Sequence, residues 1–282
     1  MSKRLAGRYG YPEDNPFRVT FHPERLEEPL HWRKPRMVFV CSMGDLFHED
    51  VPFDFICKVW NVMRYARNHT FMLLTKHPKR MLEWFQAVQE WSEYGQGSYM
   101  IFGGGKPKSY GGDGIIVGKA KRWPLPNVWL GVTAENQQRA DERIPILLQI
   151  PAAKRFVSVE PMLGPIDLIQ SAGIEITDVG TFGLIDWCIV GGETGPGARP
   201  MHPDWARSLR DQCQEAWVPF FFKNWGEWLW VHPERKRHEY SSPPEKCSTI
   251  GGMRFYRVGK KRAGRLLDGQ AWDQFPERSD SP

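Results

Sequence analysis

Cysteine is scarce in this chain, and its spacing fits no known framework. The 282 residues include five cysteines, Cys41, Cys57, Cys188, Cys213 and Cys247, and none belongs to a Cys-x-x-Cys pair. An odd number of widely spaced cysteines excludes a disulfide scaffold and a zinc site built from local motifs. We therefore predict no metal site, and free thiols indicate a reducing compartment such as the cytoplasm.

Long apolar runs are also missing. No segment approaches the ~18 consecutive apolar residues of a membrane span, and Met1 to Leu5 is not followed by the apolar stretch of a signal peptide. We therefore expect a cytoplasmic protein without a membrane partner. The net charge is only +5, from 38 Lys and Arg against 33 Asp and Glu. This mild excess fits ordinary solubility, and it also fits an anionic partner such as nucleic acid or a nucleotide.

The chain does contain six short apolar runs, each followed by polar residues. The runs span residues 37–41, 71–74, 128–132, 155–159, 186–190 and 220–222. Continuous apolar runs of this length are typical of strands buried on both faces of a parallel sheet. Segments with helical spacing lie between them, at 53–67, 78–89, 137–148, 167–172 and 202–216. The alternation predicts an α/β fold, a TIM-like (β/α) barrel with its active site at the carboxyl ends of the strands.

A weak seventh run at Arg18–His22 completes the set of expected strands. About seven parallel strands are one fewer than a closed barrel needs, so we expect an incomplete barrel whose first strand is missing. We assign residues 1–226 to this barrel, with an insertion rich in glycine and aromatic residues at 92–126. The insertion is interpreted as a lid over a nucleotide-like ligand or as a surface loop without a binding role. Residues 227–282, rich in tryptophan and basic residues, form a C-terminal extension.

The polar residues that follow the runs supply the catalytic candidates. Glu160 comes directly after the fourth run and is the first candidate, as a base, an acid or a ligand of a cationic group. A salt bridge to Lys76 or Lys223 is the alternative for this carboxylate. Lys76 and Lys223 each follow a strand and are the other catalytic candidates, because a lysine there can neutralise phosphate or carboxylate or act as an acid.

Other strand ends supply candidates for binding a substrate or cofactor. Gly191 and Gly192 allow close approach of a ligand to the backbone, and Glu193 can then bind an amine or two hydroxyls, although a tight turn explains the same triplet. The remaining candidates are Asp45, Thr75, Glu135, Asn136, Thr194, Arg199 and His22, each with an ordinary structural explanation as well. We expect Arg80 and Arg143 on helices, where they face solvent or the rim from outside.

Seven motifs occur in an order that resembles a known family. They lie at residues 19–26, 39–47, 73–81, 129–136, 157–165, 189–195 and 221–226. Together they resemble the phage gp thirty-seven / gp sixty-eight family, which is similar to radical S-adenosylmethionine enzymes and, more distantly, to spore photoproduct lyase. The resemblance extends from about residue 3 to residue 226. It implies S-adenosylmethionine and a [4Fe–4S] cluster as cofactors of a full-length homologue.

The chain departs from this family at its N-terminus. Members carry a motif of three cysteines whose thiolates would hold the cluster, whereas Met1 to Pro12 resembles the sequence just after that motif. The resemblance therefore implies no cofactor for the chain as given. Two explanations stay open: Met1 is an internal methionine of a longer gene, or the chain is truncated and cannot cleave S-adenosylmethionine reductively. In radical S-adenosylmethionine enzymes, a similar Gly-Gly-Glu triplet follows an early strand and meets the amino group of the cofactor. Here it follows a late strand, so the resemblance implies that Glu193 contacts the substrate.

Three functional hypotheses follow, so whether the chain is an enzyme stays open. The leading one is a phage or mobile-element protein resembling radical S-adenosylmethionine enzymes, which acts on nucleic acid or a nucleotide but lacks the iron–sulfur site. The second is a non-catalytic barrel that binds nucleic acid or another partner. The third is a hydrolase or lyase that uses Glu135, Glu160 and Glu193 as acid and base.

Overall fold

The computed structural model describes residues 7, 11–15, 18–42, 44–93, 99–100, 116–117, 124–173, 184–231 and 247–277. Contacts between Cα atoms divide the chain into two compact units. Unit 1 comprises Met1–Trp129 and Pro151–Ala153, and unit 2 comprises Leu130–Ile150 and Lys154–Pro282. The division falls within one strand of the central sheet.

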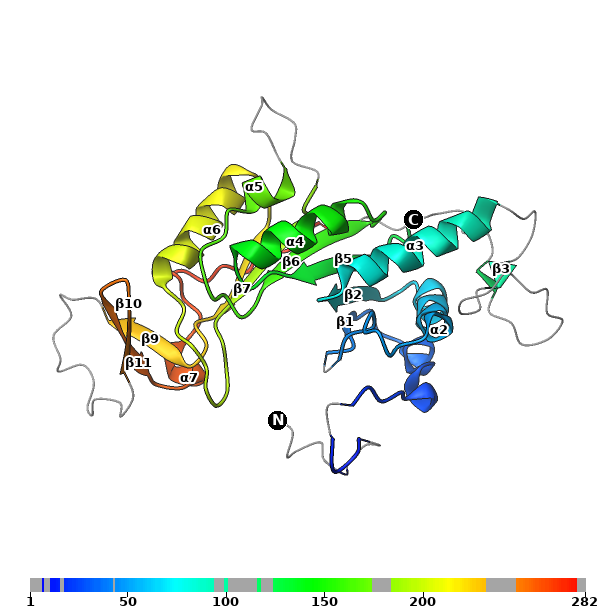
Figure 1. Ribbon diagram of the computed structural model, residues 1–282, viewed down its shortest axis with the longest axis horizontal. Coiled ribbons are helices and arrows are strands. Elements are labelled where there is room, and N and C mark those ends of the chain that lie inside the picture. Colours follow the sequence, from blue (N-terminus) through cyan, green and yellow to red (C-terminus); the bar gives the residue numbers. More distant parts are fainter. Residues whose placement is uncertain are drawn as a thin grey trace. The chain divides into compact units, whose positions relative to one another are not determined.

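The central sheet has six strands in the order β1-β2-β5-β6-β7-β8 (Figure 1). These are β1 (Met37–Val40), β2 (Thr70–Thr75), β5 (Val128–Thr133), β6 (Lys154–Val159), β7 (Trp187–Gly191) and β8 (Phe220–Asn224). Strand β1 pairs in parallel with β2, and β7 pairs in parallel with both β6 and β8. Each strand begins and ends within two residues of a predicted run. The α/β prediction is therefore confirmed.

The prediction of a seventh strand at residues 18–22 is wrong. This segment has no strand geometry, and two short 3-10 helices follow it, η1 (Pro23–Arg25) and η2 (Glu28–His31). The hydroxyl of Thr20 donates to the carbonyl of Arg18 at 3.0 Å, a local bond that competes with pairing to another strand. Pro23 then ends the run, since proline has no N–H for a ladder.

Unit 1 is built around aromatic packing between two helices. These are α2 (Phe53–Tyr65) and α3 (Pro78–Glu93), and α3 extends four residues beyond its predicted end. The rings of Trp60 and Trp84 are fully buried, with centroids 4.9 Å apart. Within the predicted insertion at 92–126, β3 (Tyr99–Met100) and β4 (Ile116–Val117) pair in antiparallel fashion. Most of the insertion lies outside the described residues.

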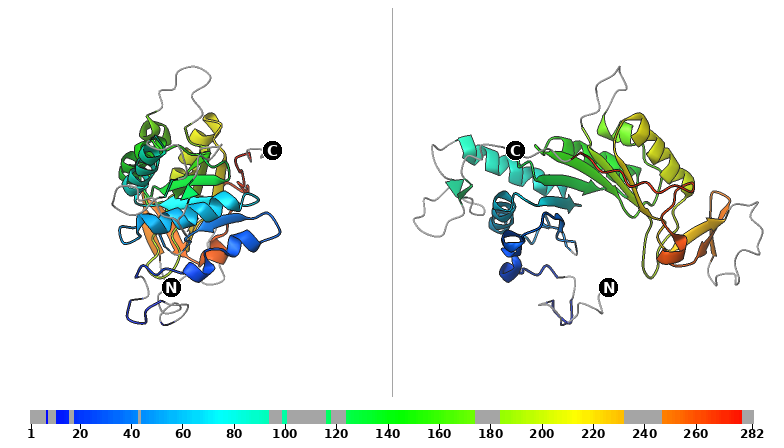
Figure 2. Two further views of the ribbon diagram at one scale, coloured as in Figure 1. Left: turned by 90° about the vertical axis from the view of Figure 1, so that its right-hand side faces the viewer. Right: turned by 180° about the vertical axis from the view of Figure 1, so that it is seen from behind.

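In unit 2, three helices lie along one face of strands β6 and β7 (Figures 1 and 2). They are α4 (Gln137–Leu148), α5 (Leu168–Ala172) and α6 (Pro203–Glu215). Helix α4 has the predicted bounds, because the Asn136 side chain accepts from the backbone N–H of Arg139 and caps its first turn. Across the described part of the chain, no helix combines the length and apolar character needed to cross a membrane.

The predicted C-terminal extension contains a second sheet. Its strands are β9 (Trp228–Val231), β10 (Cys247–Ile250) and β11 (Met253–Arg257), in the antiparallel order β10-β11-β9 (Figure 2). Helix α7 (Lys260–Ala263) follows β11. Trp228 and Phe255 form a buried cluster with Ala198 of the loop after β7. This cluster joins the small sheet to the rest of unit 2.

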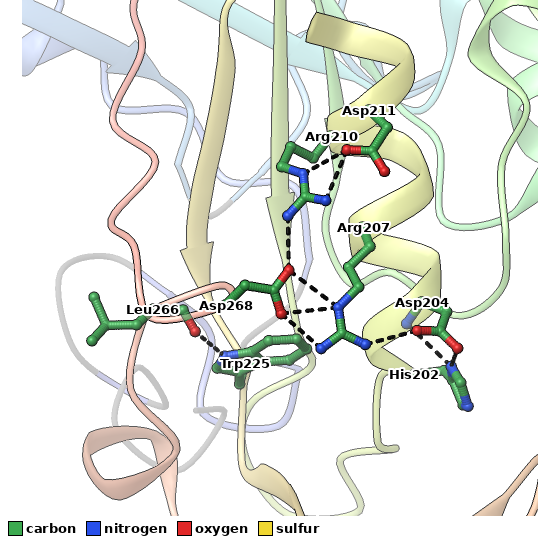
Figure 3. A network of polar contacts seen from close by, with 8 residues as sticks. All are labelled: His202, Asp204, Arg207, Arg210, Asp211, Trp225, Leu266 and Asp268. Atoms are coloured by element: carbon green, nitrogen blue, oxygen red, sulfur yellow. Dashed lines mark hydrogen bonds and ion pairs between the residues drawn. The ribbon is translucent and has the colours of Figure 1, made fainter. Parts of the chain in front are cut away.

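The C-terminal segment then returns to cover the edge of β8. The N–H of Phe222 donates to the carbonyl of Trp272 at 2.9 Å, so backbone groups of the edge strand find partners. Asp268 accepts from Arg207 and from Arg210, both on α6, at 2.7–3.1 Å (Figure 3). These bonds fix residues 264–277 to the same unit as β6, β7 and β8.

Candidate functional site

In unit 1, the candidates Asp45, Thr75 and Lys76 are joined by hydrogen bonds. Asp45 accepts from the Thr75 hydroxyl at 2.7 Å and from the backbone N–H of Lys76 at 2.8 Å. Nε2 of His77 lies 4.0 Å from the same carboxylate. Thr75 is buried. Asp45 and Thr75 therefore tie the loop after β1 to the end of β2.

His22 lies away from any strand end, because the strand expected before it is absent. Its Nδ1 atom is 3.3 Å from the Glu24 carboxylate, and its ring lies 5.4 Å from the ring of Tyr11. The residue directly precedes η1. It therefore occupies a local turn of unit 1.

In unit 2, an ion pair crosses the carboxyl edge of the sheet. Nζ of Lys223, on β8, lies 2.8 Å from Oε2 of Glu160, which directly follows β6. Strand β7 lies between these strands and ends at Gly191. A Cβ atom at Gly191 would lie 3.1 Å from Oε1 of Glu160, so the glycine leaves room for the carboxylate to reach Lys223. The salt-bridge alternative predicted for Glu160 is confirmed for Lys223.

This ion pair is accessible from solvent. The Glu160 side chain is 27% exposed and that of Lys223 is 48% exposed. The backbone around them is fixed, because the N–H of Met162 donates to the carbonyl of Gly191 at 2.9 Å and that of Leu163 donates to the carbonyl of Glu135 at 2.8 Å. Two opposite charges are thus presented on a rigid edge where a ligand can reach both.

A second ion pair, between Glu135 and Arg143, lies deeper. One guanidinium nitrogen of Arg143 donates to the Glu135 carboxylate at 3.0 Å and to the Thr133 carbonyl at 2.7 Å. Both side chains are at most 13% exposed. Our expectation that Arg143 faces outward was therefore wrong, because it belongs to the buried stripe of α4 with Ala140, Ile144 and Leu147. Its spacing from those apolar residues was the signal in the sequence.

Arg80, the other arginine expected to face outward, is also held by the protein. Its guanidinium donates to the Val51 carbonyl at 2.7 Å and lies 4.6 Å from the centre of the Phe53 ring. The residue is half-buried. Arg80 thus stabilises the start of α2 in unit 1.

In the Gly191-Gly192-Glu193 triplet, Gly192 packs against another segment of the chain, and Glu193 binds an arginine of the loop that follows. A Cβ atom at Gly192 would lie 2.2 Å from the backbone oxygen of Trp225, so a neighbouring segment of the same chain takes the space expected for a ligand. Glu193 binds Arg199 through two side-chain bonds and one backbone bond, all of 2.8 Å. These bonds close the loop after β7. Thr194, within that loop, is exposed.

The charges around this loop influence one another. Hydrogen bonding to Arg199 holds the pKa of Glu193 below its usual value, so this carboxylate stays ionised near neutral pH. The pKa of the Arg199 guanidinium is raised, chiefly by its hydrogen bond to Glu193 and also by the charge of Glu135. Glu135, Glu193, Arg143 and Arg199 therefore form one electrostatic group.

The cysteines of the described region do not fit an iron–sulfur cluster. Cys57, Cys188 and Cys213 are buried, whereas Cys41 and Cys247 are exposed. A hydrogen bond with Cys188, together with burial, raises the pKa of Cys213 well above its usual range, and burial raises that of Cys57 to about 12. Cluster ligands are thiolates, and within the described ranges no three His, Cys, Asp or Glu side chains are grouped to hold a metal ion.

Comparisons with known proteins identify one family. Residues 1–276 match a family described as a protein of unknown function (DUF5131). The comparisons with curated proteins and with solved structures found no match.

Proposed function

This chain belongs to the DUF5131 family of proteins of unknown function, and we propose that it binds S-adenosylmethionine at the carboxyl ends of β6 and β8. The observation that carries the proposal is the accessible ion pair between Glu160 and Lys223, which passes over Gly191. The resemblance to radical S-adenosylmethionine enzymes supports this choice of ligand. The fold that we propose to hold it is an incomplete (β/α) barrel.

The aminocarboxylate end of S-adenosylmethionine is complementary to this pair. Its ammonium group can bind to Glu160, and its carboxylate can bind to Lys223. A ligand with both charges replaces the internal ion pair without leaving either protein charge unpaired. Exposed ion pairs contribute only about 0–1 kcal/mol to stability, so separating Glu160 from Lys223 costs little.

We place the nucleoside end of the ligand toward Glu135, whose carboxylate lies deeper than the ion pair of Glu160 and Lys223. The backbone of Glu135 is bonded to the loop that follows Glu160, and Arg143 fixes its carboxylate at 3.0 Å. A few fixed polar groups of this kind determine the orientation of a small ligand. We therefore assign the ribose hydroxyls to the side of Glu135.

The residues of this site bind and orient S-adenosylmethionine. When bound, S-adenosylmethionine supplies a sulfonium whose carbon–sulfur bonds are activated for group transfer. Lys223 and Glu160 hold its charged end, and Gly191 leaves space for the carboxylate to turn between Lys223 and the ligand. The described cysteines do not fit an iron–sulfur cluster, so the proposed roles belong to Glu160, Lys223 and Gly191.

A hydrolase that uses Glu135, Glu160 and Glu193 is less well supported. Each of these carboxylates is bound to a cation, namely Arg143, Lys223 or Arg199. A general acid needs a raised pKa, whereas Arg199 lowers that of Glu193.

Equilibrium dialysis with labelled S-adenosylmethionine tests the proposal. We expect binding to the unaltered chain, weakened about tenfold or more in Lys223→Gln and in Glu160→Gln, since a charged hydrogen bond contributes about 1.5–3 kcal/mol. Lys154→Gln is the matched control, because Lys154 forms a 3.0 Å ion pair with Asp186 at the other end of β6. Absence of binding to the unaltered chain, or equal loss in all three variants, would overturn the proposal.

A further inference from the structure

One described segment near the C-terminus carries positive charges and no negative ones. Residues 247–267, which comprise β10, β11, α7 and the start of the returning C-terminal segment, contain six arginines and lysines and no acidic residue. The remaining residues carry 32 of the 38 basic and all 33 of the acidic side chains. Without this segment, the net charge of the chain would be −1 instead of +5.

Two of the six cations are neutralised by carboxylates. Arg257 lies 3.9 Å from Glu227 and donates to the Gly195 carbonyl, and Arg265 is bound to Asp273. The other four, Arg254, Lys260, Lys261 and Arg262, are exposed. No carboxylate of the described residues forms an ion pair with any of these four. As far as the described residues are concerned, these four exposed charges are open to an external anion.

One face of the small sheet holds its buried aromatic cluster, whereas Leu229 of β9, the partner of Tyr256, lies on the other face. Phe255 is buried against Trp228, and Met253 and Ile250 also face this cluster. Strand alternation and the register place Arg254, Tyr256 and Thr249 on the opposite face. Arg254 is hydrogen-bonded to Tyr256 there. A cation and an aromatic ring on one sheet face are the side chains that contact phosphate and stack on bases.

From these observations we infer that β11 and α7 form a binding surface for the phosphate backbone of a nucleic acid. Arg254, Lys260, Lys261 and Arg262 contact phosphates, and Tyr256 offers a ring for stacking. A run of separate cations fits a partner with regularly repeated negative charges. This surface lies outside the site at Glu160 and Lys223, and its binding does not depend on that site.

Nucleic acid fits this surface better than a membrane does. A helix that lies on a membrane presents a broad apolar face beside its cations. Helix α7 has only four residues, and its one apolar residue, Ala263, is buried. Phe255 and Trp228 are also turned inward. Anionic vesicles therefore serve as a competing ligand in the test.

Fluorescence anisotropy with short labelled RNA and DNA, single- and double-stranded, tests this inference. The variant is Lys260→Gln, Lys261→Gln and Arg262→Gln together. The control combines Lys58→Gln, Arg67→Gln and Lys79→Gln, which removes the same charge from exposed positions of unit 1. Circular dichroism checks that both variants fold, and vesicles containing phosphatidylserine are titrated in parallel.

We expect the α7 variant to lose about tenfold or more in affinity at about 50 mM salt, because three phosphate contacts are removed. Its plot of log affinity against log salt should be less steep by about 0.7–0.9 for each lost contact. The control should match the unaltered chain. Equal losses in both variants, failure of the unaltered chain to bind any nucleic acid, or α7-dependent binding to vesicles alone would overturn the inference. None of these outcomes bears on S-adenosylmethionine binding, which is measured separately.

Discussion

The carboxylate of Glu160 reaches Lys223 because Gly191 has no side chain. The two charged atoms are 2.8 Å apart, on the two strands that flank β7, and Oε1 of Glu160 would lie 3.1 Å from a Cβ atom at Gly191. At the neighbouring Gly192, an added Cβ atom would instead lie 2.2 Å from the backbone oxygen of Trp225. The two glycines therefore have different roles, which substitutions can separate.

Gly191→Ala should weaken ligand binding with little loss of stability. The added methyl group would lie 3.1 Å from Oε1 of Glu160, so this flexible side chain has to shift by a few tenths of an ångström, which lengthens its contact with Lys223. Gly192→Ala should instead destabilise the fold by about 1–3 kcal/mol or more, because the Trp225 carbonyl cannot move as easily. Thermal unfolding and S-adenosylmethionine titration of both variants check this pair of outcomes. Equal effects of the two substitutions on stability would contradict it.

Arg143→Met should destabilise unit 2 by about 3–5 kcal/mol, the usual effect of removing one partner of a buried ion pair. The substitution removes the hydrogen bonds that Arg143 donates to the Glu135 carboxylate and to the Thr133 carbonyl. Urea unfolding measures the change. Arg139→Met is the control, since Arg139 forms an exposed pair with Glu142 on the same helix, and its loss should stay within about 0.5 kcal/mol.

The free energy of unfolding should fall in acid, because Asp268 stabilises the fold only while its carboxylate is charged. Its pKa is held below its ordinary value of 3.8, chiefly by hydrogen bonds from Arg207 and Arg210. A carboxylate with a lowered folded-state pKa stabilises fully above its ordinary pKa, and this contribution is lost as pH falls through the lower, folded-state value. Asp268→Asn should therefore be less stable than the unaltered chain at pH 7, with the difference shrinking below pH 3.8. A difference that stays constant with pH would argue against this ion-pair role.

Removal of residues 265–282 should expose the edge of β8 and lower the melting temperature. The deletion removes the backbone bonds to Phe220 and Phe222 and the Asp268 network on α6 (Figure 3). An unpaired strand edge also promotes association between chains. Thermal unfolding and light scattering measure both effects. An unchanged melting temperature without association would show that the segment does not stabilise the sheet.

The sequence predicted the elements that have strong local signals. The six strands follow from continuous apolar runs, and the bounds of α4 follow from its helical pattern, which Pro151 ends; the role of Asn136 as its N-cap was seen only in the structure. The small sheet was not predicted: the Gly251-Gly252 turn between β10 and β11 is a local hairpin signal that was missed, whereas the pairing of β9 with β11 joins residues farther apart in sequence. The inward position of Arg143 and the meeting of Glu160 with Lys223 likewise depend on neighbouring elements. The expected strand at 18–22 failed because its hydrogen bonding is local.

The most direct test of the account pairs a ligand change with a protein change. Isothermal titration would compare S-adenosylmethionine with 5′-methylthioadenosine, which lacks the aminocarboxylate, on the unaltered chain and on Lys223→Gln. We predict that the unaltered chain prefers S-adenosylmethionine by about tenfold or more, and that Lys223→Gln loses most of this preference, because the ligand carboxylate then has no charged partner. An equal preference in both proteins would contradict the assignment of this site.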